Sequence, residues 1–378
     1  MLHWLRDNLS RRGLLTGGLA AASGTVLTGI AAELAAQTQV PHAEHGGAGA
    51  VPQAIKGMGQ HGTHGGMITP GEVDNARNGF DPTAILTDWT TGTVSTLPDG
   101  RRLRTYEVTA EDKEIEVAPG VRFAAWTYNG RVPGPTLRAT EGERLRIVFQ
   151  NRGSHPHTMH FHGIHSARMD GVPGAGEVIP GGEFVYEFDA LPFGCHLYHC
   201  HAVPLKRHIH KGLYGAFIID PDPERHPEQA ALARGRLLGT PENREWQEMV
   251  MVMNGFDTNF DNENEVYGVN TVAHHFMKHP IQIARRRPVR IYLVNILEFD
   301  LINSFHLHAN FFDYYDHGTS LTPTLRTVDT IMQCQAQRGI IEFSYRNHET
   351  GAYMFHAHQS EFAELGWMGM FEVTEATA

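Results

Sequence analysis

Four short histidine motifs and one cysteine are the residues of this chain best suited to chemistry. The motifs are His157-x-x-His160-Phe161-His162, His199-Cys200-His201, His306-Leu307-His308 and His356-Ala357-His358. The chain holds 25 histidines, and histidine is the commonest metal-binding side chain. Successive side chains on a β-strand point to opposite faces, so both histidines of each His-x-His pair share a face. The four pairs therefore supply enough imidazoles for two or three metal ions, and too many for one.

Cys200 is the most informative of these residues. Strand alternation directs it away from the face that carries His199 and His201. With His157 and His208 it forms a set of two imidazoles and one thiolate, the ligand type of blue-copper electron-transfer sites. Such a thiolate is connected through two short backbone paths to ligands on the opposite face. Zinc is the rival metal, but a structural zinc site is closed by four ligands, and these histidines overfill it.

The elements that position these motifs are expected to be β-strands in two blocks. Short runs rich in Val, Ile, Thr, Phe and Tyr alternate with turns such as Asn129-Gly130 and Pro133-Gly134-Pro135. Strands are expected at 104–109, 121–128, 145–149, 183–188 and 214–219, then at 248–253, 289–294, 340–345 and 368–373, with a short helix at 228–236. Each block has a strand ending in Asn, a His-x-His pair and a second histidine-bearing strand. This weak repetition predicts two copies of one metal-binding sandwich.

The chain divides into five expected segments. These are a signal peptide (1–37), a flexible lead-in (38–77), a first domain (78–221), a linker (222–245) and a second domain (246–378). Arg11-Arg12 before an apolar stretch resembles a twin-arginine export signal, with an ordinary secretory signal or an uncleaved anchor as alternatives. We therefore expect a periplasmic or extracellular protein with no membrane span after processing. The lead-in also contains His and Met, which could collect copper, although a solvated linker is favoured.

Composition excludes other classes of protein. A net charge of −11 argues against a nucleic-acid partner, because binding phosphates requires an excess of Lys and Arg. Three cysteines do not make a disulfide scaffold. Cys195 and Cys334 could pair after export or remain two free buried thiols, and the sequence leaves both alternatives open.

Several motifs together resemble the multicopper oxidase family, over residues 100–373. They are Tyr128-Asn129-Gly130-x-x-Pro133-Gly134-Pro135-Thr136, His160-Phe161-His162-Gly163, Asp170-Gly171-Val172-Pro173 and His199-Cys200-His201. The resemblance implies an all-β protein of two cupredoxin-like Greek-key β-sandwich domains. It also implies four coppers per chain: a type 1 copper that oxidises a small-molecule donor, and one type 2 and two type 3 coppers that reduce O2 to water.

The resemblance assigns roles by position. The type 1 ligands are His157, Cys200 and His208, with Leu213 at the axial position and His210 as the alternative to His208. The type 2 ligands are His160 and His306, and the type 3 ligands are His162, His199, His201, His308, His356 and His358. Leucine cannot coordinate, so a trigonal copper of high potential is expected. The neighbouring histidines are expected to orient the ligands: His155, His165, His196 and His210.

Two carboxylates are the expected proton relays. Asp170 lies in the Asp-Gly-x-Pro motif, whose acid resembles the proton-delivery residue of laccases; a turn-stabilising aspartate is the alternative. Glu361 follows the last histidine pair by three residues and is expected to serve the other side of the cluster.

One departure from the family matters. Familiar laccases have three domains with the blue copper in the last, whereas here the cysteine falls in the first of two, and Ala357 stands where a second cysteine would be needed. The chain resembles two-domain members, similar in assembly to trimeric copper nitrite reductases. This implies a homotrimer with each cluster between the first domain of one subunit and the second domain of the next. The expected activity is laccase-like oxidation of phenols or aromatic amines. The alternatives are a cuprous or other metal-ion oxidase, a copper nitrite reductase and a non-catalytic protein that stores copper or carries electrons.

Overall fold

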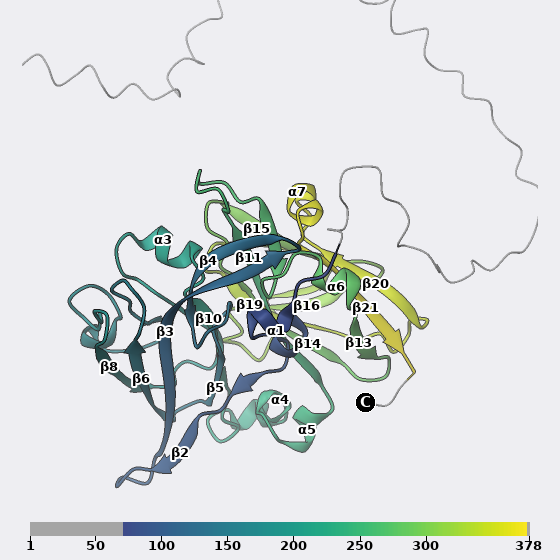
Figure 1. Ribbon diagram of the computed structural model, residues 1–378. Helices are drawn as coiled ribbons and strands as arrows, with labels where there is room; N and C mark the ends of the chain where they lie inside the picture. Colours follow the sequence, from purple (N-terminus) through teal and green to yellow (C-terminus); the bar gives the residue numbers. More distant parts are fainter. Residues whose placement is uncertain (1–70, 376–378) are drawn as a thin grey trace, which may run out of the picture. The chain divides into compact units, whose positions relative to one another are not determined.

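The computed structural model describes residues 71–375, whose regular elements are mainly β-strands (Figure 1). The expected signal peptide and residues 38–70 of the expected lead-in lie outside the described residues. The described chain begins with two short helices, α1 (Asn75–Asn78) and α2 (Pro82–Ile85). The side chains of Asp74 and Asp81 cap them by accepting backbone N–H bonds. Regular structure thus starts just before residue 78.

The strands between residues 89 and 220 form two sheets. The first has the order β1 (Trp89–Thr90), β5 (Thr136–Thr140), β10 (Tyr214–Asp220), β9 (Gly194–His199) and β7 (His160–Phe161). The second has the order β2 (Thr93–Thr96), β3 (Arg102–Ala118), β6 (Arg144–Asn151) and β8 (Glu183–Asp189), with β4 (Val121–Tyr128) paired to β3. Along β6 the residues alternate between half-buried and buried positions, as expected for a strand that covers a core with one face.

The strands between residues 247 and 374 form two further sheets. One has the order β12 (Val266–Val269), β11 (Gln247–Phe256), β14 (Val289–Asn295), β19 (Arg338–Phe343), β16 (Phe312–Asp316) and β17 (Leu325–Val328). The other has the order β13 (Ile281–Ala284), β21 (Met368–Thr374), β20 (Gly351–His356), β15 (Ile302–Leu307) and β18 (Thr330–Cys334). Strands distant in sequence are neighbours in every sheet. The all-β prediction of two cupredoxin-like Greek-key sandwiches is confirmed.

The predicted elements lie where the sequence placed them. Each expected run overlaps a strand, namely β3, β4, β6, β8, β10, β11, β14, β19 or β21. Asn129 and Gly130 adopt positive φ angles of 52° and 69°, as a tight turn between strands requires. The helix expected at 228–236 is a 3₁₀ turn (Pro227–Gln229) followed by α4 (Ala230–Arg236), and α5 (Pro241–Arg244) comes next. None of the helices in the described part of the chain has the length and apolar character that crossing a bilayer demands.

An apolar core joins the two sandwiches. Every residue of β10 and of β14 is buried, so both strands are covered on both faces. Leu197 and Ile218 of the first sandwich belong to the same buried cluster as Val252 and Ile340 of the second. The site-bearing loops of both sandwiches are therefore held on one continuous framework.

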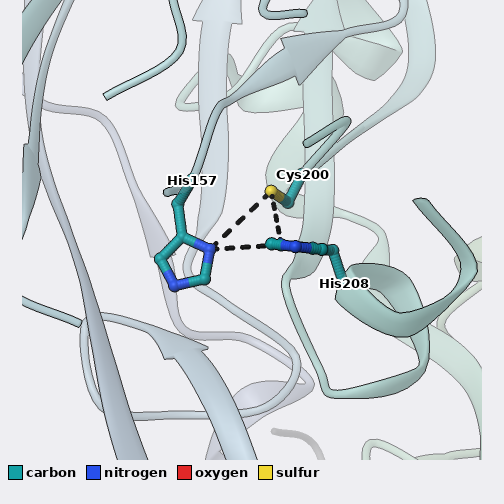
Figure 2. A group of neighbouring side chains, drawn as sticks. All are labelled: His157, Cys200 and His208. Carbon is teal, nitrogen blue, oxygen red and sulfur yellow. Dashed lines mark hydrogen bonds between the residues drawn. The ribbon is translucent and has the colours of Figure 1, made fainter. Parts of the chain in front are cut away.

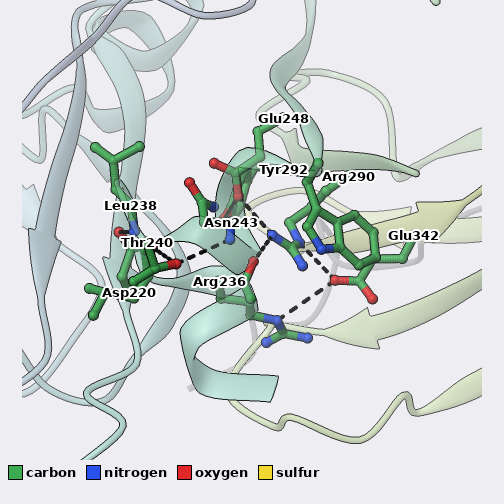
Figure 3. Close-up of polar contacts among 12 residues, drawn as sticks. Asp220, Arg236, Leu238, Thr240, Asn243, Glu248, Arg290, Tyr292 and Glu342 are labelled. Atoms are coloured by element: carbon green, nitrogen blue, oxygen red, sulfur yellow. Dashed lines mark hydrogen bonds and ion pairs between the residues drawn. The ribbon is translucent and has the colours of Figure 1, made fainter. Parts of the chain in front are cut away.

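Buried ion pairs reinforce this contact (Figure 3). Arg138 on β5 bonds Asp220 on β10 at 2.9 Å and Glu248 on β11 at 2.8 Å, and its side chain is only 1% exposed. Arg290 on β14 bonds Glu248 at 2.8 Å and Glu342 on β19 at 2.7 Å. Burial raises the pKa of Glu248, but Arg138 and Arg290 outweigh burial and hold it at about 2. The Glu248 carboxylate is therefore charged and depends on both arginines, whereas burial outweighs Arg138 and raises the pKa of Asp220.

We expect Arg138→Met to lower the free energy of unfolding by about 3–5 kcal/mol, because it leaves two buried carboxylates without their shared cation. Urea unfolding followed by circular dichroism measures the loss. Arg146→Met is the matched control. Its side chain is 42% exposed and pairs with Glu187, so a change below about 1 kcal/mol is expected. Equal losses of unfolding free energy in the two variants would show that the buried network stabilises the fold no more than an exposed ion pair does.

Candidate metal centres

Cys200 follows strand β9 directly, and its sulfur faces the imidazoles of His157 and His208 (Figure 2). The sulfur lies 3.2 Å from His208 Nδ1 and 3.9 Å from His157 Nδ1, and the two Nδ1 atoms are 3.2 Å apart. His157 stands in the loop after β6, where its backbone bridges to Val178, and His208 lies on α3 (Leu205–His210). A loop, a strand end and a helix thus bring together the set that the sequence predicted.

The environment of this set suits a copper ion. Burial, together with His208, lowers the pKa of His157 to about 3, and burial first, then His155 and Arg207, lowers that of His208 to about 4. Both imidazoles are therefore neutral at pH 7 and have a lone pair for a metal. His157 Nε2 is buried without a hydrogen-bond partner, so placing the proton there leaves Nδ1 free to bind. Burial raises the pKa of the Cys200 thiol to about 11, so a bound cation is what would stabilise the thiolate.

The structure distinguishes His208 from His210. His210 Nε2 accepts a hydrogen bond from the backbone N–H of Asp257 at 3.1 Å, and its ring packs against Phe123 and Phe299. It points away from the sulfur and ties α3 to a loop of the second sandwich. Leu213, the expected axial residue, is fully buried in the same apolar cluster as Cys200.

A group of four histidines lies on the other side of Cys200. Strands β7 and β9 pair so that His160 faces His199. The ring centre of His160 lies 5.1 Å from that of His162 and 5.2 Å from those of His199 and His201. The Nε2 atoms of His162 and His199 are 3.1 Å apart. Two nitrogens at this separation fit one metal with bonds of about 2 Å.

The second sandwich repeats this arrangement. Strands β15 and β20 pair so that His306 faces His356. The ring centre of His306 lies 5.0, 5.2 and 5.1 Å from those of His308, His356 and His358. The Nε2 atoms of His308 and His356 are 2.9 Å apart. Both groups therefore present inward-facing Nε2 atoms in the same geometry.

Backbone carbonyls orient these imidazoles in both groups. His160 Nδ1 donates to Asp170 O at 2.6 Å, and His306 Nδ1 lies 3.0 Å from Asp329 O. His199 and His356 likewise use Nδ1 on the carbonyls of the residues that follow them, at 2.9 and 2.6 Å. A hydrogen bond at Nδ1 fixes the tautomer that leaves Nε2 free for a metal.

The two groups differ in exposure. The first is buried or half-buried, and burial, His199 and Arg338 lower the pKa of His162 to about 2. In the second, His308 and His358 are exposed. Among residues 71–375, no hydrogen bond or ring contact joins a histidine of one group to a histidine of the other. Within one chain, the two histidine groups are therefore separate, and each has imidazole nitrogens available to bind a metal.

The expected acids have different surroundings. One carboxylate oxygen of Asp170 lies 3.2 Å from His160 Nδ1 and 3.9 Å from His165 Nε2, at the edge of the first group. Glu361 lies on α7 (Ser360–Glu364), and no side-chain hydrogen bond or ion pair in the described structure connects it to the histidines. The backbone carbonyl of Asp329 takes the place in the second group that the Asp170 carbonyl has in the first, and sequence reasoning missed it. It comes 23 residues after His306, and only the pairing of β15 with β18 brings it there.

The remaining predicted residues are also placed. His165 and His196 use Nε2 on the carbonyls of Phe161 and Pro192, at 3.0 and 2.9 Å. Cys195 and Cys334 are both free thiols, so the disulfide alternative is wrong. The alternative of two buried thiols holds for Cys195 and is wrong for Cys334, which is exposed. Its edge strand β18 carries it on the solvent side.

Fold and site together define a class, that of copper proteins built from cupredoxin-like sandwiches with more than one metal group. Residues 109–224 and 243–377 match two family models described as multicopper oxidase. A crystal structure described as a multicopper oxidase is 54% identical, with a TM-score of 0.73, over 80% of this chain and 100% of that one. The chain belongs to the multicopper oxidase family.

Other relatives match over shorter spans. Copper-containing nitrite reductase from Neisseria meningitidis is 33% identical over 112 residues, which is 29% of this chain and 28% of that protein. Copper resistance protein A homolog from Pseudomonas syringae is 34% identical over 126 residues, 32% of this chain and 21% of that protein. The chain thus matches less than a third of the length of these relatives. Copper nitrite reductase from Nitrosomonas europaea, 21% identical with a TM-score of 0.61 over 73% of this chain and 95% of that one, shares the fold.

Proposed function

We propose that this protein is an oxidase that takes electrons singly from a small-molecule donor at the Cys200 site and delivers them to O2 at the two histidine groups. Copper, four ions per chain, would supply the redox chemistry at both places. The observation that carries the proposal is the arrangement around Cys200, whose sulfur faces the His157 and His208 imidazoles while His199, the residue before it, belongs to the first histidine group.

The chain's own residues support an internal electron path. The backbone of Cys200 connects its buried sulfur to His199 on one side and His201 on the other. A hydrogen bond of 2.9 Å from His199 Nδ1 to the Cys200 carbonyl adds a second connection. We infer that Asp170 delivers protons, because its carboxylate lies within 3.2 Å of His160 and is partly exposed.

We also propose a homotrimer in which the first histidine group of one subunit meets the second group of the next. The exposed imidazoles of His308 and His358 support it, because a finished metal cluster is shielded from water. Exposed apolar side chains lie close in sequence to both groups: Ile164 is 64% exposed and Phe311 is 56% exposed. A neighbouring subunit would cover them. Light scattering in solution measures the oligomeric state.

Copper stoichiometry together with the visible spectrum tests the proposal. About four coppers per chain, a strong blue band and O2 uptake with a donor would support an oxidase. Two coppers with the same band, and reduction of nitrite, would support the second candidate, which the match to nitrite reductases favours. One copper would leave only a carrier. The second complete histidine group is the observation against both alternatives, because neither requires it.

The natural donor and the location belong to the same proposal. We infer a phenol or aromatic amine as donor, with a cuprous or other metal ion as the alternative. The paired residues Arg11-Arg12 support export through the twin-arginine route to the periplasm or the medium.

Leu213→Met is expected to lower the reduction potential of the Cys200 site by tens of millivolts, because a thioether adds a weak axial ligand that leucine cannot supply. Redox titration of the blue band measures the shift. Leu197→Met, a change of equal size at another buried position, is the control and should leave the potential unchanged. An unchanged potential in Leu213→Met would mean that Leu213 is not axial.

A further inference from the structure

A cavity of about 480 Å3 lies beside the Cys200 site. Its lining includes Trp126, His155, Ala124 and Arg207. A volume of this size is within the range of about 300–1,000 Å3 typical of small-molecule pockets. The cavity is separate from both four-histidine groups, since none of their members lines it.

Trp126 is the link between the cavity and the Cys200 site. Its ring centre lies 4.7 Å from that of His208 and 5.3 Å from that of His157, and on the cavity side it lies 4.6 Å from His155. His157 and His208 are only 0% and 2% exposed, so a molecule in the cavity cannot touch their rings directly. An electron leaving the cavity would therefore cross Trp126.

Arg207 is the cation of the cavity whose side chain has no partner among the described residues, whereas Lys113 donates to the carbonyls of Asn78 and Gly130. Glu114 already pairs with Arg77 and Arg122, each at 3.4 Å. Lys211 donates to the Ala124 carbonyl and stands over the Trp126 ring. Within residues 71–375, no side-chain hydrogen bond or ion pair engages the Arg207 guanidinium.

The lining also argues against a metal ion as donor. No methionine or cysteine lines the cavity, and these are the soft ligands that a cuprous ion prefers. Asp112 is exposed and already accepts a hydrogen bond from Ser154 N at 3.2 Å. The three cationic lining residues, Lys113, Arg207 and Lys211, outnumber the carboxylates of Asp112 and Glu114, and the rings of Trp126 and His155 suit an aromatic ligand.

We propose that this cavity binds the electron donor, that the donor is a single-ring phenol carrying a carboxylate, and that Trp126 conducts its electron to the Cys200 site. The inference rests on the proposed oxidase function. The phenol ring contacts Trp126 and His155, and the carboxylate binds Arg207. Each phenol loses one electron to the Cys200 site and its hydroxyl proton to solvent, and becomes a phenoxyl radical. Four phenols supply the four electrons, and four protons complete the conversion of one O2 to two waters.

Calorimetry on the copper-loaded protein tests the binding step with an inert probe. The carboxylate 3,4,5-trimethoxybenzoate has no phenolic hydrogen to lose, and its methyl ester is the neutral match. Ala124→Phe should place a ring in the cavity where the probe binds and weaken both probes at least about tenfold. Arg207→Gln should weaken the carboxylate about three- to fivefold and leave the ester unchanged. Ala231→Phe, at an exposed alanine of α4 outside this cavity, should change neither.

Anaerobic bleaching of the blue band tests the conduction step. Syringate, a phenol with a carboxylate, should bleach the blue band of the Trp126→Leu variant at least about tenfold more slowly than that of the wild type. The Trp126→Phe variant should bleach at an intermediate rate. The visible spectrum of each variant shows whether the Cys200 site has survived. Unchanged probe affinity in Ala124→Phe, no binding to wild type, or unchanged bleaching in Trp126→Leu would overturn the inference. Failure of the proposed oxidase itself would appear differently, as absence of O2 uptake by the wild type with ferrocyanide.

Discussion

Replacing Cys200 with serine will remove the intense visible absorption of the copper-loaded protein and reduce donor oxidation to background, while the fold remains. The Cys200 sulfur faces His157 and His208, and the blue colour depends on a bond between copper and thiolate. A serine hydroxyl is nearly the same size but does not ionise at neutral pH, so the site would keep its shape and lose its anionic ligand. Absorption spectra, copper analysis and O2 uptake measure the result.

Cys334→Ser is the matched control for this change. Cys334 is exposed on the edge strand β18, so its removal should leave colour, copper content and activity unchanged. Circular dichroism of both variants should match wild type. A blue band that survives Cys200→Ser would mean that the type 1 copper lies elsewhere in the chain.

The grouping of the candidate ligands was predictable because their pattern is local in the sequence. Each His-x-His pair ends or follows a strand, and strand alternation places its members on one face without knowledge of the fold. The same rule separates Cys200 from His199. The choice between His208 and His210 needed the structure, because the helix α3 and the Asp257 amide of the second sandwich decide which ring turns toward the sulfur.

Contacts between distant strands were not predictable. The register of β15 with β18 brings the Asp329 carbonyl to His306, and no residue near His306 in the sequence predicts this contact. Trp126 belongs to an ordinary apolar strand pattern, and only the approach of α3 and of the loop after β6 to β4 places His208, His157 and His155 beside its ring. Glu361 follows a candidate ligand by three residues, and its role as a proton relay stays a prediction, since no side-chain hydrogen bond or ion pair in the described structure connects it to the histidines.

The second sandwich has the same backbone hydrogen bonds as the Cys200 site of the first, but lacks the cysteine. Cys200 N donates to Leu213 O at 2.9 Å, and Ala357 N donates to Trp367 O at 3.1 Å. His201 N and His358 N each donate to a hydroxyl, Thr158 and Ser304, at 2.7 Å. Ala357 stands where the first sandwich has Cys200, and the fully buried Trp367 stands where it has Leu213. Among the described residues, the second sandwich therefore offers histidines but no thiolate site, so the proposed entry of electrons is confined to the first.

His308→Ala will abolish O2 reduction and leave the blue band intact. His308 Nε2 faces His356 Nε2 at 2.9 Å, so its loss opens the coordination of the second group. The Cys200 site shares no ligand with that group, so donor should still bleach the band, and air should fail to restore it. Stopped-flow absorption measures the bleaching and recovery of the band, and an oxygen electrode measures O2 uptake. His279→Ala, an exposed histidine outside the metal groups, is the control. Loss of the band as well would indicate misfolding or a different layout.

Mixing the two inactive variants then tests the proposed shared cluster. At each interface of the proposed trimer, one subunit supplies Cys200 with the first histidine group, and its neighbour supplies His308. A His308→Ala subunit followed by a Cys200→Ser subunit has both, so co-expressed variants should regain activity. Random mixing at equal amounts gives one half times one half, or about one quarter, of interfaces in the productive order. A cluster formed within one chain predicts no recovery at all, because every chain would then lack either the cysteine or the histidine.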